Sequence, residues 1–231
     1  SDNPALKTRK VMNTITRYSH LAAIIVAVAL CLNVAPAQAG FDKGNGGDVL
    51  VCTTATTATV HLLDEFEAHY EWAMSDLTKP ATLDERLTVL ERHLPDLVQQ
   101  IRQERPWVEQ NLRFVKDAKL TDLDDDQLYW LPKNCTREQV AIQNSAGVLI
   151  DEALWTKMSV SSQAKLLSHE ILYRILDRDP RFSSAHRLPS SKPVRFLNAL
   201  LWSADFEKAD WPSLRPTMTS LGLEPLLLPE K

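Results

Sequence analysis

Residues 166–176 read Leu-Leu-Ser-His-Glu-Ile-Leu-Tyr-Arg-Ile-Leu. Apolar residues fall on nearly every side of the helix that this stretch would form, which predicts a buried, central helix. At 100° per residue, His169 and Tyr173 share one face, and Glu170 and Arg174 lie on the neighbouring stripe. Polar side chains inside such a helix need partners, so we expect the functional or structural polar residues of the protein here.

The His169-Glu170 pair resembles the His-Glu-x-x-His helix of zinc metallopeptidases, in which two histidines hold the metal and the glutamate activates water. The setting, a hairpin followed by a capped helix, is similar over residues 138–178. The resemblance implies His169 as a zinc ligand and Glu170 as the catalytic base, with His186 as a candidate further ligand. The second histidine position holds Tyr173, and a neutral phenol is a poor zinc ligand.

A structural interpretation explains the same residues without metal. Glu170 and Arg174 are spaced for an i,i+4 ion pair, Arg195 on a following helix can join them, and His169 can share a buried hydrogen-bond network with Tyr173. Because the second histidine is missing, we favour this non-catalytic or degenerate-site interpretation, with no bound cofactor. A zinc-dependent hydrolase is the alternative.

The sequence around the central helix predicts further helices and a few short strands. Ser159 or Ser161 can cap the central helix, which should run to about Asp177. Other helices are expected over 60–77, over 83–115 with breaks at Pro95 and Pro106, and from 190 to about 206. Strands are expected over 49–52, 127–131, 138–143 and 148–150, the last two forming a hairpin across the turn at 144–147. The expected fold class is α+β, mostly helical, with a small antiparallel sheet packed on the central buried helix.

The N-terminal segment has the pattern of a cleavable secretory signal peptide. An unbroken apolar run over 21–32 follows four basic residues and precedes Ala37-Gln38-Ala39, a small-x-small cleavage site. A membrane anchor needs about 20 apolar residues, and Asn33 and Pro36 interrupt the run too early. We therefore expect an extension and signal peptide over 1–39, with Met12 or an upstream residue as the start, and one exported domain over 40–231, either periplasmic or secreted.

Charge and length limit the partners of the exported domain. Residues 1–39 hold four of the 26 basic and one of the 30 acidic residues, so the net charge falls from −4 for the whole chain to −7 without them. An acidic domain argues against nucleic acid as a partner. No other apolar run is long enough to span a membrane. Which protein or envelope component is its partner does not follow from the sequence.

Two of the three cysteines, Cys52 and Cys135, lie beyond the signal segment. Thiols in an oxidising compartment tend to pair, so we expect a Cys52–Cys135 disulfide that ties the first strand to the middle of the chain.

Short motifs along the chain resemble a group of exported bacterial proteins of uncharacterised function. They are the residues 44–48 (Gly-Asn-Gly-Gly-Asp) with Cys52, 62–64 (Leu-Leu-Asp), Cys135 with 139–141 (Gln-Val-Ala), 169–174 (His-Glu-x-x-Tyr-Arg) and 194–195 (Val-Arg). The resemblance implies export and assigns no catalytic role.

Other kinds of site find little support. No Gly-x-Ser-x-Gly nucleophile elbow occurs, and His61 and His69 are too far apart along one helix for a single metal ion. Trp155 and Trp202 lie in apolar patterns and are expected in the core.

Overall fold

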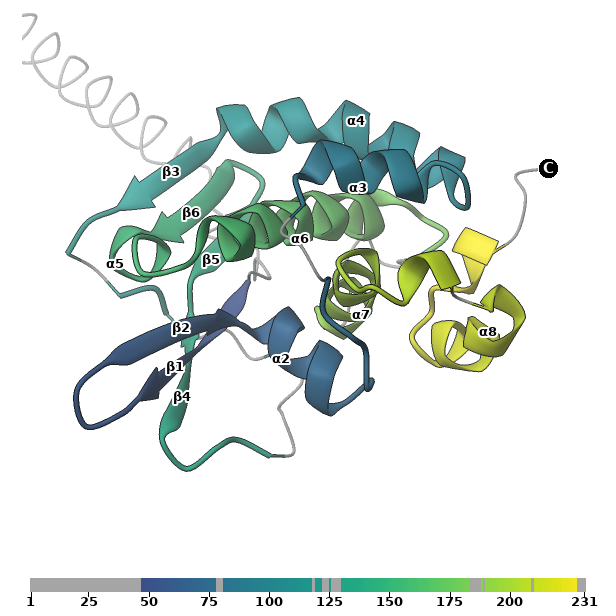
Figure 1. Ribbon diagram of the computed structural model, residues 1–231. Coiled ribbons are helices and arrows are strands. Elements are labelled where there is room, and N and C mark those ends of the chain that lie inside the picture. The colour runs from purple at the N-terminus through teal and green to yellow at the C-terminus, as the bar shows by residue number, and fades with distance from the viewer. Residues whose placement is uncertain are drawn as a thin grey trace, which may run out of the picture. The chain divides into compact units, whose positions relative to one another are not determined.

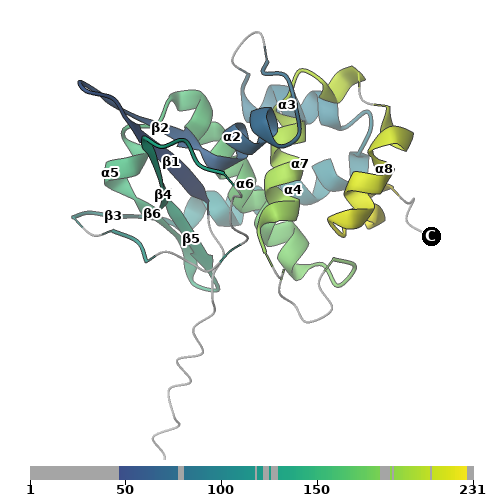
Figure 2. The same ribbon diagram turned by 90° about the horizontal axis from the view of Figure 1, so that it is seen from below.

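The computed structural model describes residues 47–77, 81–117, 119–121, 125, 130–182, 188, 190–208 and 210–227. Its central element is helix α6 (Val160–Arg178), which carries His169 and Glu170. Of the two candidate caps, Ser159 is the one used, because its hydroxyl accepts a hydrogen bond from the backbone N–H of Ser162. In both views α6 lies between the strands at one end and helix α8 at the other (Figures 1 and 2).

Six further α-helices and two short 3₁₀ helices lie in the described part of the chain. The α-helices are α2 (Leu63–Tyr70), α3 (Leu83–Leu90), α4 (Pro95–Gln110), α5 (Glu152–Trp155), α7 (Lys192–Leu201) and α8 (Trp211–Ser220). The 3₁₀ helices are η1 (Phe206–Lys208) and η2 (Glu224–Leu227). Helix α3 begins with a capping box between Thr82 and Glu85. Helices α4 and α7 pack on α6, and α2 packs on α7 (Figure 1).

The described strands form two three-stranded sheets. The first has the order β2-β1-β4 and is antiparallel, with β1 (Asp48–Thr53), β2 (Ala58–Leu62) and β4 (Cys135–Gln139). The second has the order β3-β6-β5, with β3 (Leu112–Val115), β5 (Ala141–Asn144) and β6 (Gly147–Asp151). Strands β5 and β6 form the expected antiparallel hairpin, whereas β3 runs parallel to β6. The α+β fold class is confirmed, and the second sheet is mixed instead of antiparallel.

The expected helix over 60–77 is wrong at both ends. Residues 58–62 form strand β2, in which buried Val60 and Leu62 alternate with exposed His61, the period of a half-buried strand. The helix ends at Tyr70, and Ala73 has a left-handed φ of 51° that a continuing helix cannot contain.

Two other boundaries differ from the expectation. Pro106 lies inside α4 without dividing it, because the buried face of α4, which includes Ile101 and Val108, is held by packing on both sides of the proline. The helix ends at Gln110, and the residues expected to continue it form β3. Of the strand expected over 127–131, residues 127–129 lie outside the described residues, and Trp130 and Leu131 belong to no strand.

The Cys52–Cys135 disulfide is confirmed, with an S–S distance of 2.03 Å. The two cysteines are directly opposite each other on β1 and β4, and 83 positions separate them in the chain. The bond therefore joins strands that are already neighbours in the sheet.

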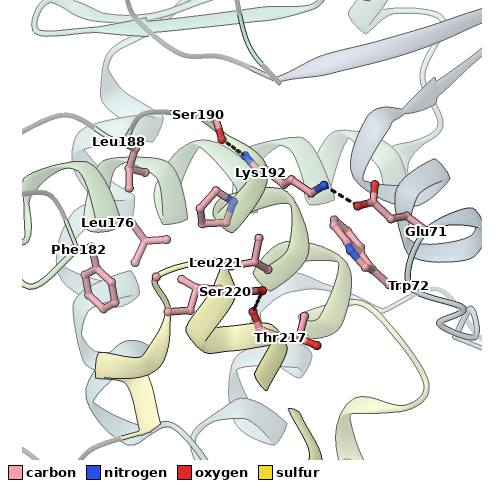
Figure 3. Close-up of a pocket in the computed structure, with 13 residues that line it drawn as sticks. Glu71, Trp72, Leu176, Phe182, Leu188, Ser190, Lys192, Thr217, Ser220 and Leu221 are labelled. Carbon is pink, nitrogen blue, oxygen red and sulfur yellow. Dashed lines mark hydrogen bonds and ion pairs between the residues drawn. The ribbon is translucent and has the colours of Figure 1, made fainter. Parts of the chain in front are cut away.

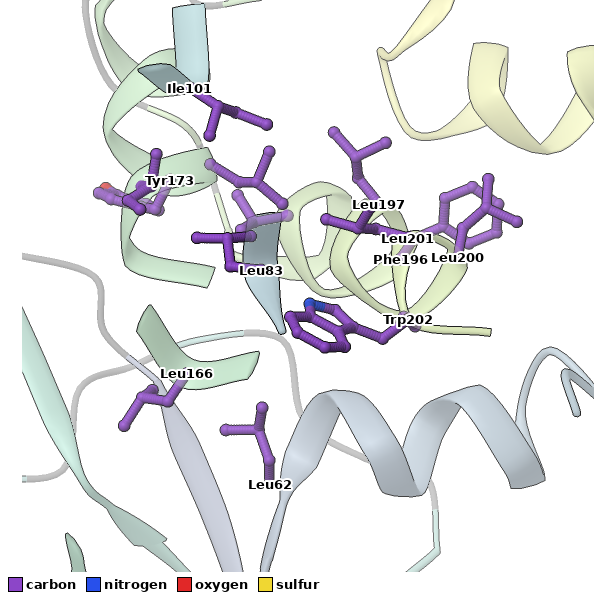
Figure 4. Close-up of a cluster of buried hydrophobic side chains, with 14 of the residues drawn as sticks. Leu62, Leu83, Ile101, Leu166, Tyr173, Phe196, Leu197, Leu200, Leu201 and Trp202 are labelled. Carbon is purple, nitrogen blue, oxygen red and sulfur yellow. The ribbon is translucent and has the colours of Figure 1, made fainter. Parts of the chain in front are cut away.

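The hydrophobic core lies where α6 meets α7, α4 and the first sheet. It includes Leu62 from β2, Leu166 and Tyr173 from α6, and Phe196 and Leu197 from α7 (Figure 4). Trp202 is buried as expected, and Trp155 is partly buried against the core.

The signal segment and the boundary near residue 40 lie outside the described residues, so the division of the chain there stays a prediction. Within the residues that are described, no helix has both the length and the apolar character needed to cross a membrane.

Candidate functional site: a buried polar cluster on helix α6

His169 lies at the centre of a cluster of polar side chains that joins three helices. Its Nδ1 is 2.8 Å from Oδ2 of Asp64 on α2. The amide of Asn198 on α7 donates to the same Asp64 oxygen at 2.6 Å and to the carbonyl of Lys165 at 3.0 Å. His169, Asp64 and Asn198 expose 0, 1 and 1% of their surfaces, so these bonds are made out of contact with bulk water.

The charge of His169 is set by two opposing effects. Burial lowers the pKa of the imidazole, but the negative charge and the hydrogen bond of Asp64 outweigh it and raise the pKa from 6.5 to about 9. The imidazole of His169 is therefore protonated at neutral pH. The other ring nitrogen, Nε2, is buried and has no hydrogen-bond partner in the described part of the chain.

Glu170 points to the other side of α6, toward the strands. Its Oε1 accepts the backbone N–H of Gly47 at 3.0 Å, and its Oε2 accepts the side-chain amide of Gln143 at 3.3 Å. Gln143 also donates to the backbone carbonyl of Glu170 at 2.9 Å. Burial raises the pKa of Glu170 to about 7, although the charge of His169 and the Gly47 bond act against it. Both carboxylate oxygens thus have fixed protein partners.

Gly47 is tightly enclosed at this contact. A Cβ at position 47 would lie 2.2 Å from Cδ1 of Leu166 and 3.3 Å from Oε1 of Glu170. Leu166 is fully buried, so it has little room to move. Glycine is therefore needed at position 47 for the backbone to reach Glu170.

A second group of buried charges surrounds Arg195 on α7. Its Nε donates to Glu67 of α2 at 2.7 Å, and its Nη1 donates to Asp125 at 2.6 Å and to the hydroxyl of Ser191. Ser191 also donates its backbone N–H to Asp125 at 2.9 Å. Burial raises the pKa of Glu67 to about 7 despite the attraction of Arg195, while the two carboxylates raise the pKa of Arg195 above its usual value in spite of burial.

Arg174 does not pair with Glu170. It lies on the α4 side of α6, where its Nε donates to Glu104 at 2.5 Å and its guanidinium stacks 3.4 Å above the ring of Trp107. The expected Glu170–Arg174–Arg195 network is therefore wrong in its pairing. Residues 170 and 174 are one helical turn apart, but Glu170 bonds to Gly47 and Gln143 near the strands, whereas Arg174 bonds to Glu104 on α4.

The expected hydrogen bond between His169 and Tyr173 is not formed, since Nδ1 of His169 is bonded to Asp64 and its Nε2 has no partner among the described residues. Tyr173 is buried in the core. His186, the candidate further metal ligand, lies outside the described residues. Among the residues that are described, no group of three histidine, cysteine, aspartate or glutamate side chains has an arrangement that could hold a metal ion.

Several members of the cluster were not singled out from the sequence as site residues: Asp64, Glu67, Asp125, Gln143, Ser191 and Asn198. A signal for three of them exists, because Asp64 and Glu67 are three apart on α2, and Asn198 lies three residues after Arg195 on α7. Each pair places two polar groups on one buried helical face. Asp125 and Gln143 come from irregular and strand sequence, where no such spacing applies.

The larger pockets of the described residues lie away from His169 and Glu170. A pocket of about 620 Å³ lies between α2, α7 and α8, where Lys192 reaches across to Glu71 at 2.6 Å and Trp72 and Leu221 line the wall (Figure 3). Next to Asp64 and Asn198 there is only about 10 Å³, room for about one water molecule. In this conformation a substrate would have no path to His169 through that space.

No protein-family model, curated protein or solved structure matches this chain.

Proposed function

We propose that this is an exported protein of the cell envelope or the secreted fraction, in which the His169-Glu170 helix has a structural and non-catalytic role. The observation that carries the proposal is the complete burial of His169 and Glu170, together with the fixed protein partners of both Glu170 oxygens. A catalytic base needs a free oxygen that faces substrate or water. Glu170 instead ties α6 to Gly47 and Gln143.

Export is supported by two independent features. The apolar run over 21–32 with a small-x-small site after it has the form of a signal peptide. The Cys52–Cys135 disulfide is the kind of bond that persists outside the cytoplasm.

Expression of the full chain in a bacterial host tests export. We expect the protein in the periplasm or medium, with a new N-terminus at Gly40 and no free thiol among Cys52 and Cys135. An unprocessed chain that remains in the cytosol with both thiols reduced would refute the proposal.

Replacement of Glu170 by leucine tests the structural role. It leaves the Gly47 N–H buried without a partner and removes one of the two hydrogen bonds of the Gln143 amide, which should cost about 2–5 kcal/mol of unfolding free energy. Glu109, which is exposed and pairs with Arg105, provides the control: Glu109→Leu should change stability by less than about 1 kcal/mol. Equal effects of the two substitutions would contradict a structural role for Glu170.

A second candidate function is a zinc-dependent hydrolase. It is favoured by one observation: the carboxylate of Asp64 holds Nδ1 of His169 and leaves Nε2 without a partner in the described part of the chain. A histidine that binds zinc through one ring nitrogen typically donates its other ring N–H to a carboxylate, as Nδ1 of His169 does to Asp64. Under this hypothesis His169 would be a ligand and Glu170 the base that activates water.

Metal content separates the two candidates. The hydrolase requires about one zinc per chain after dialysis without chelator, and loss of that zinc in His169→Ala. The structural proposal expects no stoichiometric metal and the same melting temperature before and after treatment with a chelator.

A further inference from the structure

Three buried polar atoms at the contact between α2 and α7 have no hydrogen-bond partner among the described residues. They are Oδ1 of Asp64, Oδ1 of Asn198 and the indole Nε1 of Trp202. The three residues expose only 1, 1 and 4% of their surfaces, so bulk water does not reach these atoms. A buried polar atom that stays unpaired costs free energy, and internal water molecules commonly bond to such atoms where no other protein group does.

The three residues are neighbours in the fold. The side-chain amide of Asn198 donates to Oδ2 of Asp64 at 2.6 Å. Trp202 lies one helical turn after Asn198, and its backbone N–H donates to the Asn198 carbonyl at 3.0 Å, so the two side chains share one side of the helix. All three line the space of about 10 Å³ described above, which leaves a water-sized molecule roughly one position.

The hydrogen-bonding character of each atom is fixed. Nδ2 of Asn198 donates to the Asp64 carboxylate and to the backbone carbonyl of Lys165, and both of these groups accept. The amide orientation is thereby determined, and Oδ1 of Asn198 is an acceptor. The second oxygen of the Asp64 carboxylate is also an acceptor, whereas the indole N–H of Trp202 can only donate. A ligand at this position must therefore supply two hydrogen atoms and one lone pair.

This pattern selects the chemical class of the ligand. A metal cation has no lone pair for the indole N–H of Trp202, and the positive end of that group would repel it. A halide ion has no hydrogen atom for the two acceptor oxygens, and the Asp64 carboxylate would repel it. A larger molecule does not fit in about 10 Å³. A water molecule has the required hydrogen atoms, the lone pair and the size.

We propose that one water molecule is bound between α2 and α7, where it donates to Oδ1 of Asp64 and Oδ1 of Asn198 and accepts the indole N–H of Trp202. These are about three hydrogen bonds, the usual number for an internal water molecule. The water joins the first turn of α2 to the end of α7. Neither His169 nor Glu170 lines the site, so the proposal is independent of whether their helix is structural or catalytic.

Water–protein nuclear Overhauser spectroscopy of the isotope-labelled protein tests the proposal. The indole N–H of Trp202, assigned by its loss in Trp202→Phe, should show a cross-peak to water with the sign of the cross-peaks within the protein, because a bound water tumbles with the protein. The rotating-frame experiment separates this contact from hydrogen exchange, which gives the opposite sign. Trp130, which is 60% exposed, provides the control and should show no such cross-peak. Absence of the cross-peak at Trp202 would overturn the proposal.

A variant that fills the space provides a second test. Ala199 is buried and lines the same space, so Ala199→Val should displace the water and remove the cross-peak to water, while the indole signal of Trp202 itself remains. Ala153, which is exposed on α5, provides the matched control, and Ala153→Val should retain the cross-peak. A cross-peak that persists in Ala199→Val would place the water elsewhere, and the proposal would be wrong.

A crystal structure separates water from a monovalent cation. We expect one density peak at about 2.7–3.2 Å from Oδ1 of Asp64, Oδ1 of Asn198 and Nε1 of Trp202. Crystals soaked in a rubidium salt should show no anomalous signal at this position. A rubidium peak there would overturn the proposal, because the site would then bind a cation.

Discussion

At the scale of single residues, the contacts of His169 depend on one carboxylate. Asp64 lies 2.8 Å from Nδ1, and its charge overcomes the effect of burial on the imidazole. The side chain is thus an ion-pair partner inside the core, whereas the sequence motif alone suggested a metal ligand or a partner of Tyr173.

This residue gives a direct prediction. The pKa of His169, measured from the pH dependence of its ring NMR signals, should lie near 9. In Asp64→Asn the charge that raises the pKa is lost and burial dominates, so the pKa of His169 should fall below its usual value of 6.5. A value for His169 at or below 6.5 in the unaltered protein would contradict the Asp64 ion pair.

At the scale of elements, α2 and α7 are joined by buried charges as well as by apolar packing. Arg195 bonds to Glu67 across the contact between these helices. Removing one partner of a buried ion pair costs more unfolding free energy than the intact pair contributes.

Substitutions at Arg195 and Glu67 test this link. Arg195→Met should lower the unfolding free energy by about 3–5 kcal/mol, because Glu67 remains buried without the cation to which it is bonded. Arg195→Lys should also destabilise, since an ammonium cannot reproduce the forked contacts. Adding Glu67→Leu to Arg195→Met should recover part of the loss in denaturant unfolding. If the two effects simply add, Arg195 and Glu67 are not coupled.

Some helices and strands can be predicted from the sequence, and others cannot. The apolar pattern of 166–176 predicts the central buried helix, and turn chemistry at 144–147 predicts the β5–β6 hairpin, because both are local signals. Strand β3 could not be predicted, since its four residues follow a helical pattern directly and their parallel pairing with β6 depends on a distant segment. The pairing of Arg174 with Glu104, and not with Glu170, likewise follows from the position of α4.

At the scale of the whole molecule, the buried titratable groups make stability depend on pH. Folding raises the pKa of His169 from 6.5 to about 9 and that of Glu170 from 4.5 to about 7. The folded state therefore binds more protons than the unfolded state between these values, so the unfolding free energy falls as pH rises. The contribution of Glu170 is complete below pH 4.5 and lost through pH 7, and that of His169 is complete below pH 6.5 and lost through pH 9.

We accordingly expect the melting temperature to fall between pH 5.5 and pH 9. In His169→Gln the fall between pH 7 and pH 9 should become shallower, since the group that releases its proton there is gone. Thermal unfolding followed by circular dichroism in buffers of matched ionic strength measures both effects. A melting temperature that rises over this range would exclude the proton uptake described here.

The disulfide also contributes to the unfolding free energy of the whole molecule. Replacement of Cys52 and Cys135 by serine should lower the unfolding free energy by about 4 kcal/mol, because the unfolded chain regains the freedom of a long loop. The β1–β4 pairing should survive, so the circular dichroism spectrum at room temperature should be retained. The same measurement on the unaltered protein with and without reductant provides the control, and an unchanged stability would show that the bond adds nothing to the strand pairing.

The polar cluster has a consequence for how the chain matures. Its members range from Gly47 at the start of the first strand to Asn198 in α7, and Arg195 supplies the cation for two carboxylates from earlier segments. A nascent chain that stops short of α7 would have to bury Asp64 and Glu67 without Arg195 and Asn198, which is strongly unfavourable. We therefore expect the domain to reach its stable fold only after α7 has been synthesised.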